Sequence, residues 1–241
     1  MENILVTICA RGGSKGIPGK NIKNLNGNPL IYYSLKIAEE FLNKKGNTQV
    51  VLSTDDGEIK DVVKGISSKA DTDYLRPDFL ASDTAGKLDA IVDAKNYMEQ
   101  KNSIQYDYVI DLDVTSPLRN FTDLNNALQL LKENESAYNI FSVSPANRNP
   151  YFNMVEEQES GYYSLCKTGK FLTRQSAPKV YDMNASFYIF RKPFFEKGFQ
   201  TVITDRSLVY EVPHLCFDLD HPIDYEIMSY LMENKKLDFD L

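Results

Sequence analysis

The chain has 241 residues, of which 42% are hydrophobic, so it is long enough to bury a full core. A net charge of -7 makes the surface as a whole repel polyanions, which argues against nucleic acid as a partner. The three cysteines lack C-x-x-C spacing and therefore predict neither a disulfide framework nor a zinc site.

The first predicted element is an apolar strand at 4–10, with no signal-peptide pattern before it. No apolar stretch approaches the roughly 18 residues that a membrane span needs, so we expect a cytoplasmic protein with no membrane contact. The strand breaks into a glycine-rich loop that contains Gly12, Gly13 and Gly16 and three cations, Arg11, Lys15 and Lys20.

This loop predicts a phosphate site at the end of the first strand. Glycines let backbone N–H groups approach a phosphate closely, and the cations offset its charge. The loop matches neither the Walker A pattern nor the G-x-G-x-x-G dinucleotide fingerprint. A basic surface turn is the structural alternative.

Further strand-like runs alternate with helical patterns through the first 145 residues. This alternation is typical of an α/β fold with a mostly parallel sheet and helices on both faces. The other predicted strands lie at 48–53, 107–112, 138–144 and 185–190, and the predicted helices at 29–44, 86–100 and 121–133. Because ligands of such sheets bind outside the carboxyl ends of the strands, we expect functional residues in the loops that follow them.

Three of these loops have polar content of interest. Residues 53–56 read Ser-Thr-Asp-Asp and fit a helix N-cap with acidic residues in the first turn, a role that does not exclude a functional one. Residues 76–84 form a polar loop with a single cation, Arg76. In 111–119, hydroxyl side chains and Arg119 follow the strand end directly.

Two carboxylates near the C-terminus, Asp218 and Asp220, alternate along 216–220, which we predict to be a strand with both carboxylates on one side. Two like charges so close are unfavourable unless a cation lies between them. Mg²⁺ is typically held by one or two carboxylates together with substrate phosphates. The pair therefore predicts a Mg²⁺ site.

Residues 147–182 interrupt the alternation. This stretch is rich in Asn, Pro and aromatic residues and contains a turn at Gly161, so it is predicted to be an inserted β-hairpin or arm. An exposed arm with this many aromatic side chains is a candidate interface.

These motifs resemble the cytidylyltransferases that activate nonulosonic acids, which are the CMP-sialic acid synthetases and their bacterial CMP-legionaminic acid relatives. The resemblance covers most of the chain in five blocks, at 10–21, 53–55, 76–84, 115–119 and 218–220. It implies a single Rossmann-like nucleotidyltransferase domain over residues 1–241 with a small β-rich dimerisation arm. The implied reaction transfers CMP from CTP to the anomeric 2-hydroxyl of a nine-carbon α-keto acid, with Mg²⁺ and release of pyrophosphate.

The resemblance also implies roles for individual residues. CTP would be bound by Arg11, Gly13, Ser14, Lys15, Lys20, Asn21, Arg76 and Ser82. The acceptor sugar would be bound by Asp113, Thr115, Ser116, Arg119, Arg174 and Gln175. Asp218 and Asp220 match the metal pair, and Arg11, Lys20 and Asp220 are the expected catalytic residues. A homodimer through the 147–182 arm is implied as well.

Two places in the chain differ from the sialic acid enzymes, at positions that the resemblance assigns to the acceptor sugar. Asp113-Val114 stands where those enzymes commonly have Gln-Pro, and Phe152 stands where some have Lys. Both changes alter which substituents can be hydrogen-bonded and favour the legionaminic type. The alternatives are a synthetase for the eight-carbon acid Kdo, which the Arg174-Gln175 pair disfavours, and a catalytically silent nucleotide-binding module, which the intact carboxylate pair disfavours.

The only two histidines, His214 and His221, are not needed as a general base. His221 lies beside the carboxylate pair but directly before Pro222, where a helix is expected to start. We therefore interpret it as structural.

Overall fold

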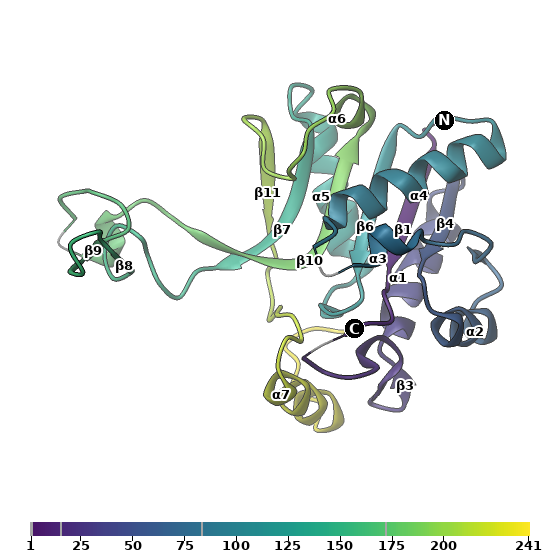
Figure 1. Ribbon diagram of the computed structural model, residues 1–241, viewed down its shortest axis with the longest axis horizontal. Coiled ribbons are helices and arrows are strands. Elements are labelled where there is room, and N and C mark those ends of the chain that lie inside the picture. The colour runs from purple at the N-terminus through teal and green to yellow at the C-terminus, as the bar shows by residue number, and fades with distance from the viewer. Residues whose placement is uncertain (1, 15, 83, 172) are drawn as a thin grey trace.

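The computed structural model describes residues 2–14, 16–82, 84–171 and 173–241. A seven-stranded sheet with the order β11-β7-β10-β6-β1-β4-β5 forms its centre (Figure 1). The strands are β1 (Ile4–Cys9), β4 (Thr48–Ser53), β5 (Ala70–Asp71), β6 (Tyr108–Asp113), β7 (Asn139–Pro145), β10 (Tyr181–Arg191) and β11 (Ser207–Glu211). Strand β10 pairs antiparallel with β6 and β7, and the other pairings in this sheet are parallel. The predicted mostly parallel sheet is confirmed.

Helices cover both faces of this sheet. Successive strand residues point to opposite faces, so Val6 packs into one core and Leu5 into another. The first core is closed by α1 (Ile31–Lys44) and α5 (Phe121–Glu133), and the second by α4 (Lys87–Asn102). The three predicted helices thus match observed ones, with starts no more than two residues from the expected positions.

The remaining elements are short or lie at the edges. They are the hairpin strands β2 (Asn24–Leu25) and β3 (Asn28–Pro29), the 3-10 helices η1 (Lys20–Ile22) and η2 (Arg174–Ser176), and the helices α2 (Gly57–Ile66), α3 (Asp78–Ala81), α6 (Lys192–Glu196) and α7 (Pro222–Glu233). For α2 the sequence predicted the N-cap but not the extent of the helix. The cap is confirmed, because the Asp56 side chain accepts hydrogen bonds from the backbone N–H groups of Glu58 and Ile59.

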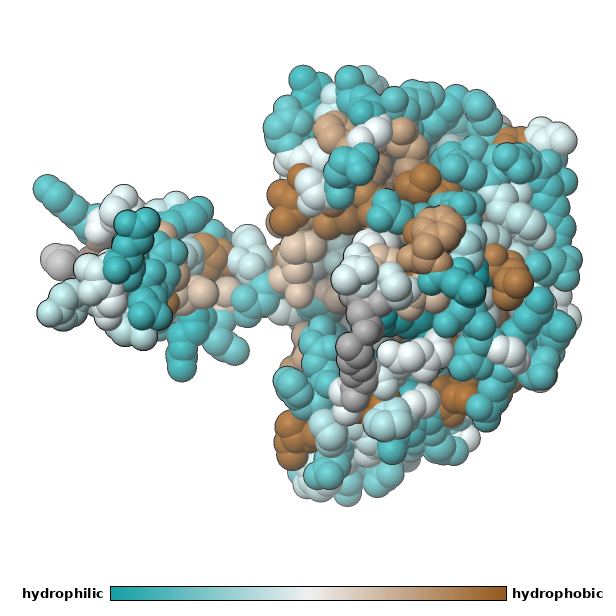
Figure 2. All heavy atoms as spheres, in the orientation of Figure 1, coloured by the Kyte–Doolittle hydropathy of each residue, from teal (hydrophilic) through white to brown (hydrophobic). Residues whose placement is uncertain are grey.

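The predicted arm projects from the sheet as an extension of β7 and β10 (Figure 1). Its tip is a hairpin of β8 (Val155–Glu157) and β9 (Tyr163–Leu165). Apolar and aromatic side chains face solvent there, with Val155 62%, Tyr162 78% and Tyr163 66% exposed. Figure 2 shows that apolar side chains also gather on the body where the arm leaves it. An interface between two copies through this arm stays a prediction.

Among the described residues, no helix combines the length and the apolar character that crossing a bilayer requires.

The C-terminal residues pack against the rest of the fold beside His214. The His214 ring stacks on Phe239 with centroids 3.5 Å apart, and Asp238 accepts a hydrogen bond from the Leu215 N–H. Both ring nitrogens of His214 face acceptors, since Nδ1 lies 3.0 Å from the Leu215 carbonyl and Nε2 lies 3.0 Å from Asp123 Oδ2. This arrangement favours the doubly protonated, charged ring.

We expect the folded protein to lose stability as pH rises through the pKa of His214. Burial lowers this pKa, but the hydrogen bonds to Asp123 and to the Leu215 carbonyl and the charges of Asp123 and Asp238 outweigh burial, so the pKa is raised. The stabilisation is therefore complete below about pH 6.5 and is lost above that value. Thermal unfolding should show that His214→Gln lowers Tm more at about pH 6 than at about pH 9. An equal loss at both pH values would contradict this.

Candidate active site

A cavity of about 390 Å³ opens at the carboxyl ends of β1, β4 and β6, beside the N-terminus of α4. Its walls come from the first loop, from 76–90, from the loop after β6 and from the segment before α7. The lining residues are Cys9, Arg11, Ser14, Gly16, Lys20, Asn21, Arg76, Leu80, Ser82, Ala85, Gly86, Lys87, Ala90, Asp113, Thr115 and Asp220. The cavity thus gathers most of the residues to which the sequence assigned a role in binding CTP.

The first loop is held by its own backbone and by the loop after β4. The buried Asn21 amide donates to the Arg11 carbonyl at 2.8 Å, and the Gly12 N–H donates to Asp55 Oδ1 at 3.0 Å. Arg11 also donates through Nη1 to the Ser82 carbonyl at 3.2 Å, which links this loop to the 76–84 loop. Acidic residues at 55–56 thus hold the first loop as well as cap α2.

The opposite ends of the chain meet at Gly16. A Cβ at this position would lie 2.3 Å from the Asp220 carbonyl oxygen, so glycine permits a contact that other residues would block. Lys20 donates through Nζ to the Leu219 carbonyl and lies 3.9 Å from Asp220 Oδ1. The Leu219 N–H donates to the Thr115 carbonyl at 2.9 Å. These contacts bring the first loop, the loop after β6 and the carboxylate segment together.

Residues 216–220, all of them described, pair with no strand, so the prediction of a strand there was wrong. The segment is fixed instead by contacts with loops and with the start of α7. The Asp224 carboxylate accepts hydrogen bonds from the Asp220 and His221 N–H groups, at 3.0 and 2.7 Å. The interpretation of His221 as a residue at the helix start is confirmed, because it is the N-cap of α7.

Asp218 lies close enough to Asp220 for the charge of Asp220 to affect its pKa. Partial burial and the neighbouring charges of Asp220 and Asp113 raise the pKa of Asp218, and Lys20 opposes this rise. The two carboxylates therefore repel each other, and a cation between them would relieve the repulsion. A Mg²⁺ site here stays a prediction. Within the described part of the chain, no group of three or more His, Cys, Asp or Glu side chains is arranged to hold a metal ion.

The two-carboxylate set matches the way that Mg²⁺ usually binds, with one or two protein carboxylates and the remaining oxygens from phosphates and water. Asp220 has a side chain 66% exposed and lines the cavity, so a cation in the cavity could reach its oxygens. The residues present therefore fit a Mg²⁺ ion that arrives with a nucleotide.

Arg76 lines the cavity although it is only 5% exposed. Its Nε donates to Ser53 Oγ at 3.0 Å and its Nη2 donates to the Ser53 carbonyl at 2.7 Å, which fixes the guanidinium at the end of β4. Ser82 belongs to the same wall and is more exposed.

Asp113 ends β6 and faces the cavity together with Thr115. Its Oδ1 accepts from the Thr115 N–H and hydroxyl, both at 2.8 Å, and its Oδ2 accepts from Lys87 Nζ at 2.6 Å. Lys87 and these hydrogen bonds lower the pKa of Asp113, in spite of burial, so the group is ionised at neutral pH.

Two predicted sugar contacts need correction. Arg119 is fully buried, and its guanidinium donates to the carbonyls of Asp113, Ser116 and Ser186 and to the Ser34 hydroxyl. Ser116 is fully buried as well, with its hydroxyl directed to the Phe217 carbonyl at 3.3 Å. Both residues brace the loop from inside, because a buried guanidinium needs several acceptors and the carbonyls of this loop provide them.

Four further predicted site residues do not line this cavity or have side chains outside the described part of the structure. Gly13 is exposed in the first loop, and Lys15 lies outside the described residues. Gln175 lines a different hollow of about 580 Å³ at the root of the arm, between Pro145 and Tyr181. Arg174 is in η2, and its side chain is not among those described. A contact of Arg174 and Gln175 with the acceptor sugar stays a prediction.

Sequence reasoning assigned no role to two cavity residues with ionisable side chains, Lys87 and Cys9. Lys87 is the first residue of α4, whose predicted start at 86 already placed it at the binding edge of the sheet. Cys9 is the last residue of β1; burial, together with the charge of Asp111, raises its pKa to about 12, so it stays a neutral thiol and not a nucleophile.

The chain is similar to proteins whose names state a chemistry. A family model described as cytidylyltransferase matches residues 5–237. The chain is 39% identical to "Post-translational flagellin modification protein B" of Campylobacter coli and 38% identical to "CMP-N,N'-diacetyllegionaminic acid synthase" of Campylobacter jejuni, over 98% of each chain in both cases. Among solved structures, a CMP:2-keto-3-deoxy-manno-octonic acid synthetase complexed with CTP matches 97% of this chain and 100% of that chain, with a TM-score of 0.67 and 18% identity.

Proposed function

Because this chain belongs to the cytidylyltransferase family, we propose that it transfers CMP from CTP to the anomeric 2-hydroxyl of a nonulosonic acid of the legionaminic or sialic type. The other product is pyrophosphate. The observation that carries this proposal is one cavity that joins the cations of the first loop, the Asp113-Thr115 wall and Asp220.

The reaction requires in-line attack of a sugar hydroxyl on the α-phosphorus, so the protein's main tasks are positioning and charge stabilisation. Arg11 and Lys20 line the cavity and would bind the phosphate oxygens and stabilise the departing pyrophosphate. Lys20 suits this role because the Leu219 carbonyl holds its ammonium and its side chain is only 12% exposed. Asn21 and Arg76 would contact the nucleoside.

Asp218 and Asp220 would hold Mg²⁺. A bound Mg²⁺ would supply charge neutralisation at the phosphates and would lower the pKa of a coordinated hydroxyl. The residues' own contribution is to keep two carboxylates adjacent, one partly buried and one open to the cavity, next to the Lys20 ammonium.

The acceptor would lie against Asp113 and Thr115. An ionised carboxylate here accepts hydrogen bonds from hydroxyl or amide groups, and buried polar groups of this kind discriminate strongly between substrates. The identity to a legionaminic acid synthase over almost the whole chain supports the legionaminic type. We also propose that the arm joins two copies into a homodimer, in line with its exposed apolar tip, and that the enzyme works in the cytoplasm, where CTP is available.

The first rival is an enzyme for the eight-carbon acid Kdo. The solved structure of that kind shares the fold at 18% identity, which supports no substrate assignment. The second rival is a catalytically silent nucleotide-binding module. It is disfavoured because such a module would gain nothing from two neighbouring, repelling carboxylates, of which Asp220 lines the cavity.

We expect pyrophosphate release only when CTP, Mg²⁺ and a suitable sugar acid are present together. A coupled assay with N,N'-diacetyllegionaminic, N-acetylneuraminic, pseudaminic and Kdo acids measures this, with mass spectrometry of the CMP-sugar. Omitting each component in turn is the control. If Kdo is the one acid of the panel that gives a CMP-sugar, the first rival is favoured. If none of the acids gives a CMP-sugar, the proposed function is contradicted.

A further inference from the structure

We propose that Lys87 is a positioning residue for the acceptor: it holds the Asp113 carboxylate in the orientation in which that group meets the sugar. The inference rests on the proposed function, because it concerns the acceptor side of the same cavity. Lys87 is not among the residues that the sequence motifs single out.

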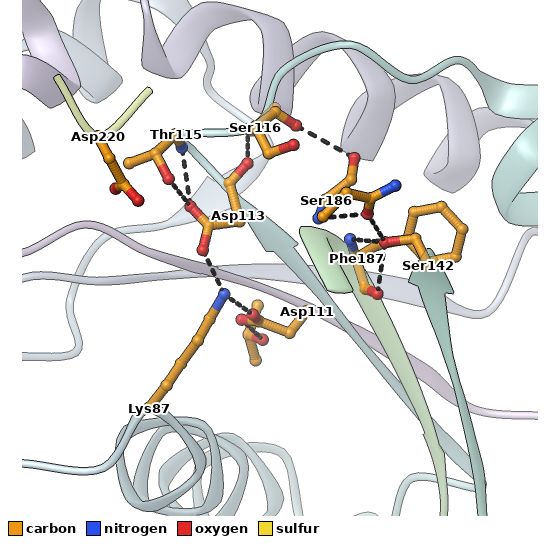
Figure 3. Close-up of polar contacts among 12 residues, drawn as sticks. Lys87, Asp111, Asp113, Thr115, Ser116, Ser142, Ser186, Phe187 and Asp220 are labelled. Atoms are coloured by element: carbon orange, nitrogen blue, oxygen red, sulfur yellow. Dashed lines mark hydrogen bonds and ion pairs between the residues drawn. The ribbon is translucent and has the colours of Figure 1, made fainter. Parts of the chain in front are cut away.

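Lys87 reaches up from the first turn of α4 into the gap between two aspartates (Figure 3). Its Nζ lies 2.6 Å from Asp113 Oδ2 and 2.9 Å from Asp111 Oδ2. The Lys87 side chain is 34% exposed and lines the cavity, whereas Asp111 is fully buried. One ammonium therefore connects an interior carboxylate to a carboxylate at the cavity wall.

Three donors leave Asp113 little freedom to rotate. Thr115 holds Oδ1 through its N–H and hydroxyl, and Lys87 holds Oδ2. An ionised carboxylate offers about four acceptor positions, so about one remains open. Asp113 is 17% exposed and faces the cavity, where this position can accept a hydrogen bond from the acceptor.

The charges at this wall indicate which chemical group is accepted. At the cavity wall itself the exposed acceptor is the ionised Asp113 carboxylate, which disfavours an anionic substituent and favours a neutral hydroxyl or amide N–H donor. The acceptor's own carboxylate should therefore lie away from Asp113, toward the cations Arg11 and Lys20 on another wall.

A purely structural role for Lys87 would be to neutralise Asp111. The two roles can be separated, because the Thr7 hydroxyl donates to Asp111 Oδ1 at 2.7 Å and an asparagine oxygen can accept the same bond. Asp111→Asn thus removes the buried charge and keeps the hydrogen bond. In Lys87→Met/Asp111→Asn, the interior needs no counter-charge, but Asp113 has lost its donor at Oδ2.

The same helix offers a matched control. Lys101 also bridges two aspartates, at 2.6 Å from Asp71 Oδ2 and 2.8 Å from Asp73 Oδ2, and its side chain is also 34% exposed. It lies in the last turn of α4, and none of these three residues lines the cavity. Lys101→Met therefore breaks an equivalent bridge away from the acceptor.

The test compares wild type, Lys87→Met, Lys87→Met/Asp111→Asn and Lys101→Met by thermal unfolding and by KM for each substrate. The acid of the panel that wild type uses best serves as acceptor. We expect Lys87→Met to lower Tm and the double variant to recover it. The double variant should still have a KM for the sugar acid raised about tenfold, with KM for CTP within about twofold of wild type. Lys101→Met should leave both KM values unchanged.

A double variant with wild-type KM for the sugar acid would overturn the inference, since Lys87 would then serve only to neutralise Asp111. An equal rise in both KM values would also overturn it, because the whole cavity would then be disturbed. If wild type turns over none of the acids, the proposed function itself fails and the role of Lys87 fails with it.

Discussion

Asp220→Asn is expected to lower kcat for CMP transfer by about a hundredfold or more while the protein stays folded. The substitution keeps the size of the side chain and removes the charge that would hold Mg²⁺ against the phosphates. Its effect on stability should be small, because the Asp220 side chain is 66% exposed and its ion pair with Lys20 is long, at 3.9 Å. Initial rates over a range of Mg²⁺ concentrations, with thermal unfolding alongside, measure both effects.

Asp205→Asn is the control for this prediction. Asp205 is also exposed, at 76% of its side chain, and has a similarly long ion pair with Arg206 at 3.9 Å, but it does not line the cavity. It should keep the wild-type rate and Mg²⁺ dependence. Unchanged turnover in Asp220→Asn would remove this residue from the metal assignment and leave the negative charge at the cavity unexplained.

The regular core was predictable because its signals are local. Buried apolar runs between polar loops gave β4 with its observed bounds, and the capping box of Asn120 and Asp123 fixes the start of α5 where the periodicity predicted it. Helix α2 was not predicted beyond its cap; it is short, and only Ile59 and Val63 of its ten residues are buried. Strand β10 begins at Tyr181 rather than 185, because its first residues lie in the exposed arm.

The candidate site was predictable where side-chain chemistry and loop position coincide. Arg11 follows β1 closely, and Lys20 and Asn21 lie in the same connection between β1 and β2, so their place in the chain predicts a position at the binding edge of the sheet. Arg119 follows β6 in the same way, yet its guanidinium turns inward to bind carbonyls. The sequence shows that a cationic side chain is present but not which way it points. Its burial in the structure indicates whether it can bind a substrate or instead stabilises the loop.

The resemblance placed the first loop and the C-terminal carboxylates in one site, but the individual contacts between distant segments could not be predicted from the sequence. Lys87 looks like an ordinary first-turn residue until β6 brings Asp111 and Asp113 to its ammonium. Likewise, the sequence explains Gly16 as one of several loop glycines. Its close approach to the Asp220 carbonyl depends on how the C-terminal segment folds back over the first loop.

Gly16→Ala is therefore expected to lower the rate of CMP transfer nearly as much as Asp220→Asn does. The new Cβ would lie 2.3 Å from the Asp220 carbonyl oxygen, and backbone on both sides leaves no flexible side chain to yield. The first loop and the carboxylate segment would have to separate by roughly 1 Å, a displacement that can cost about a hundredfold in rate when it misplaces reacting groups. Both segments lie outside the sheet, so the sheet itself should remain intact.

Gly46→Ala is the matched control, because a Cβ at Gly46 would meet nothing within 4 Å. We expect it to keep wild-type kcat/KM, whereas Gly16→Ala should lose activity with a far-ultraviolet circular dichroism spectrum like that of wild type. Raising Mg²⁺ should restore part of the activity of Gly16→Ala, since its carboxylates are displaced but still charged, and none of the activity of Asp220→Asn. Full activity in Gly16→Ala would mean that the carboxylate segment moves freely, and the contact at Gly16 would then have no part in placing Asp220.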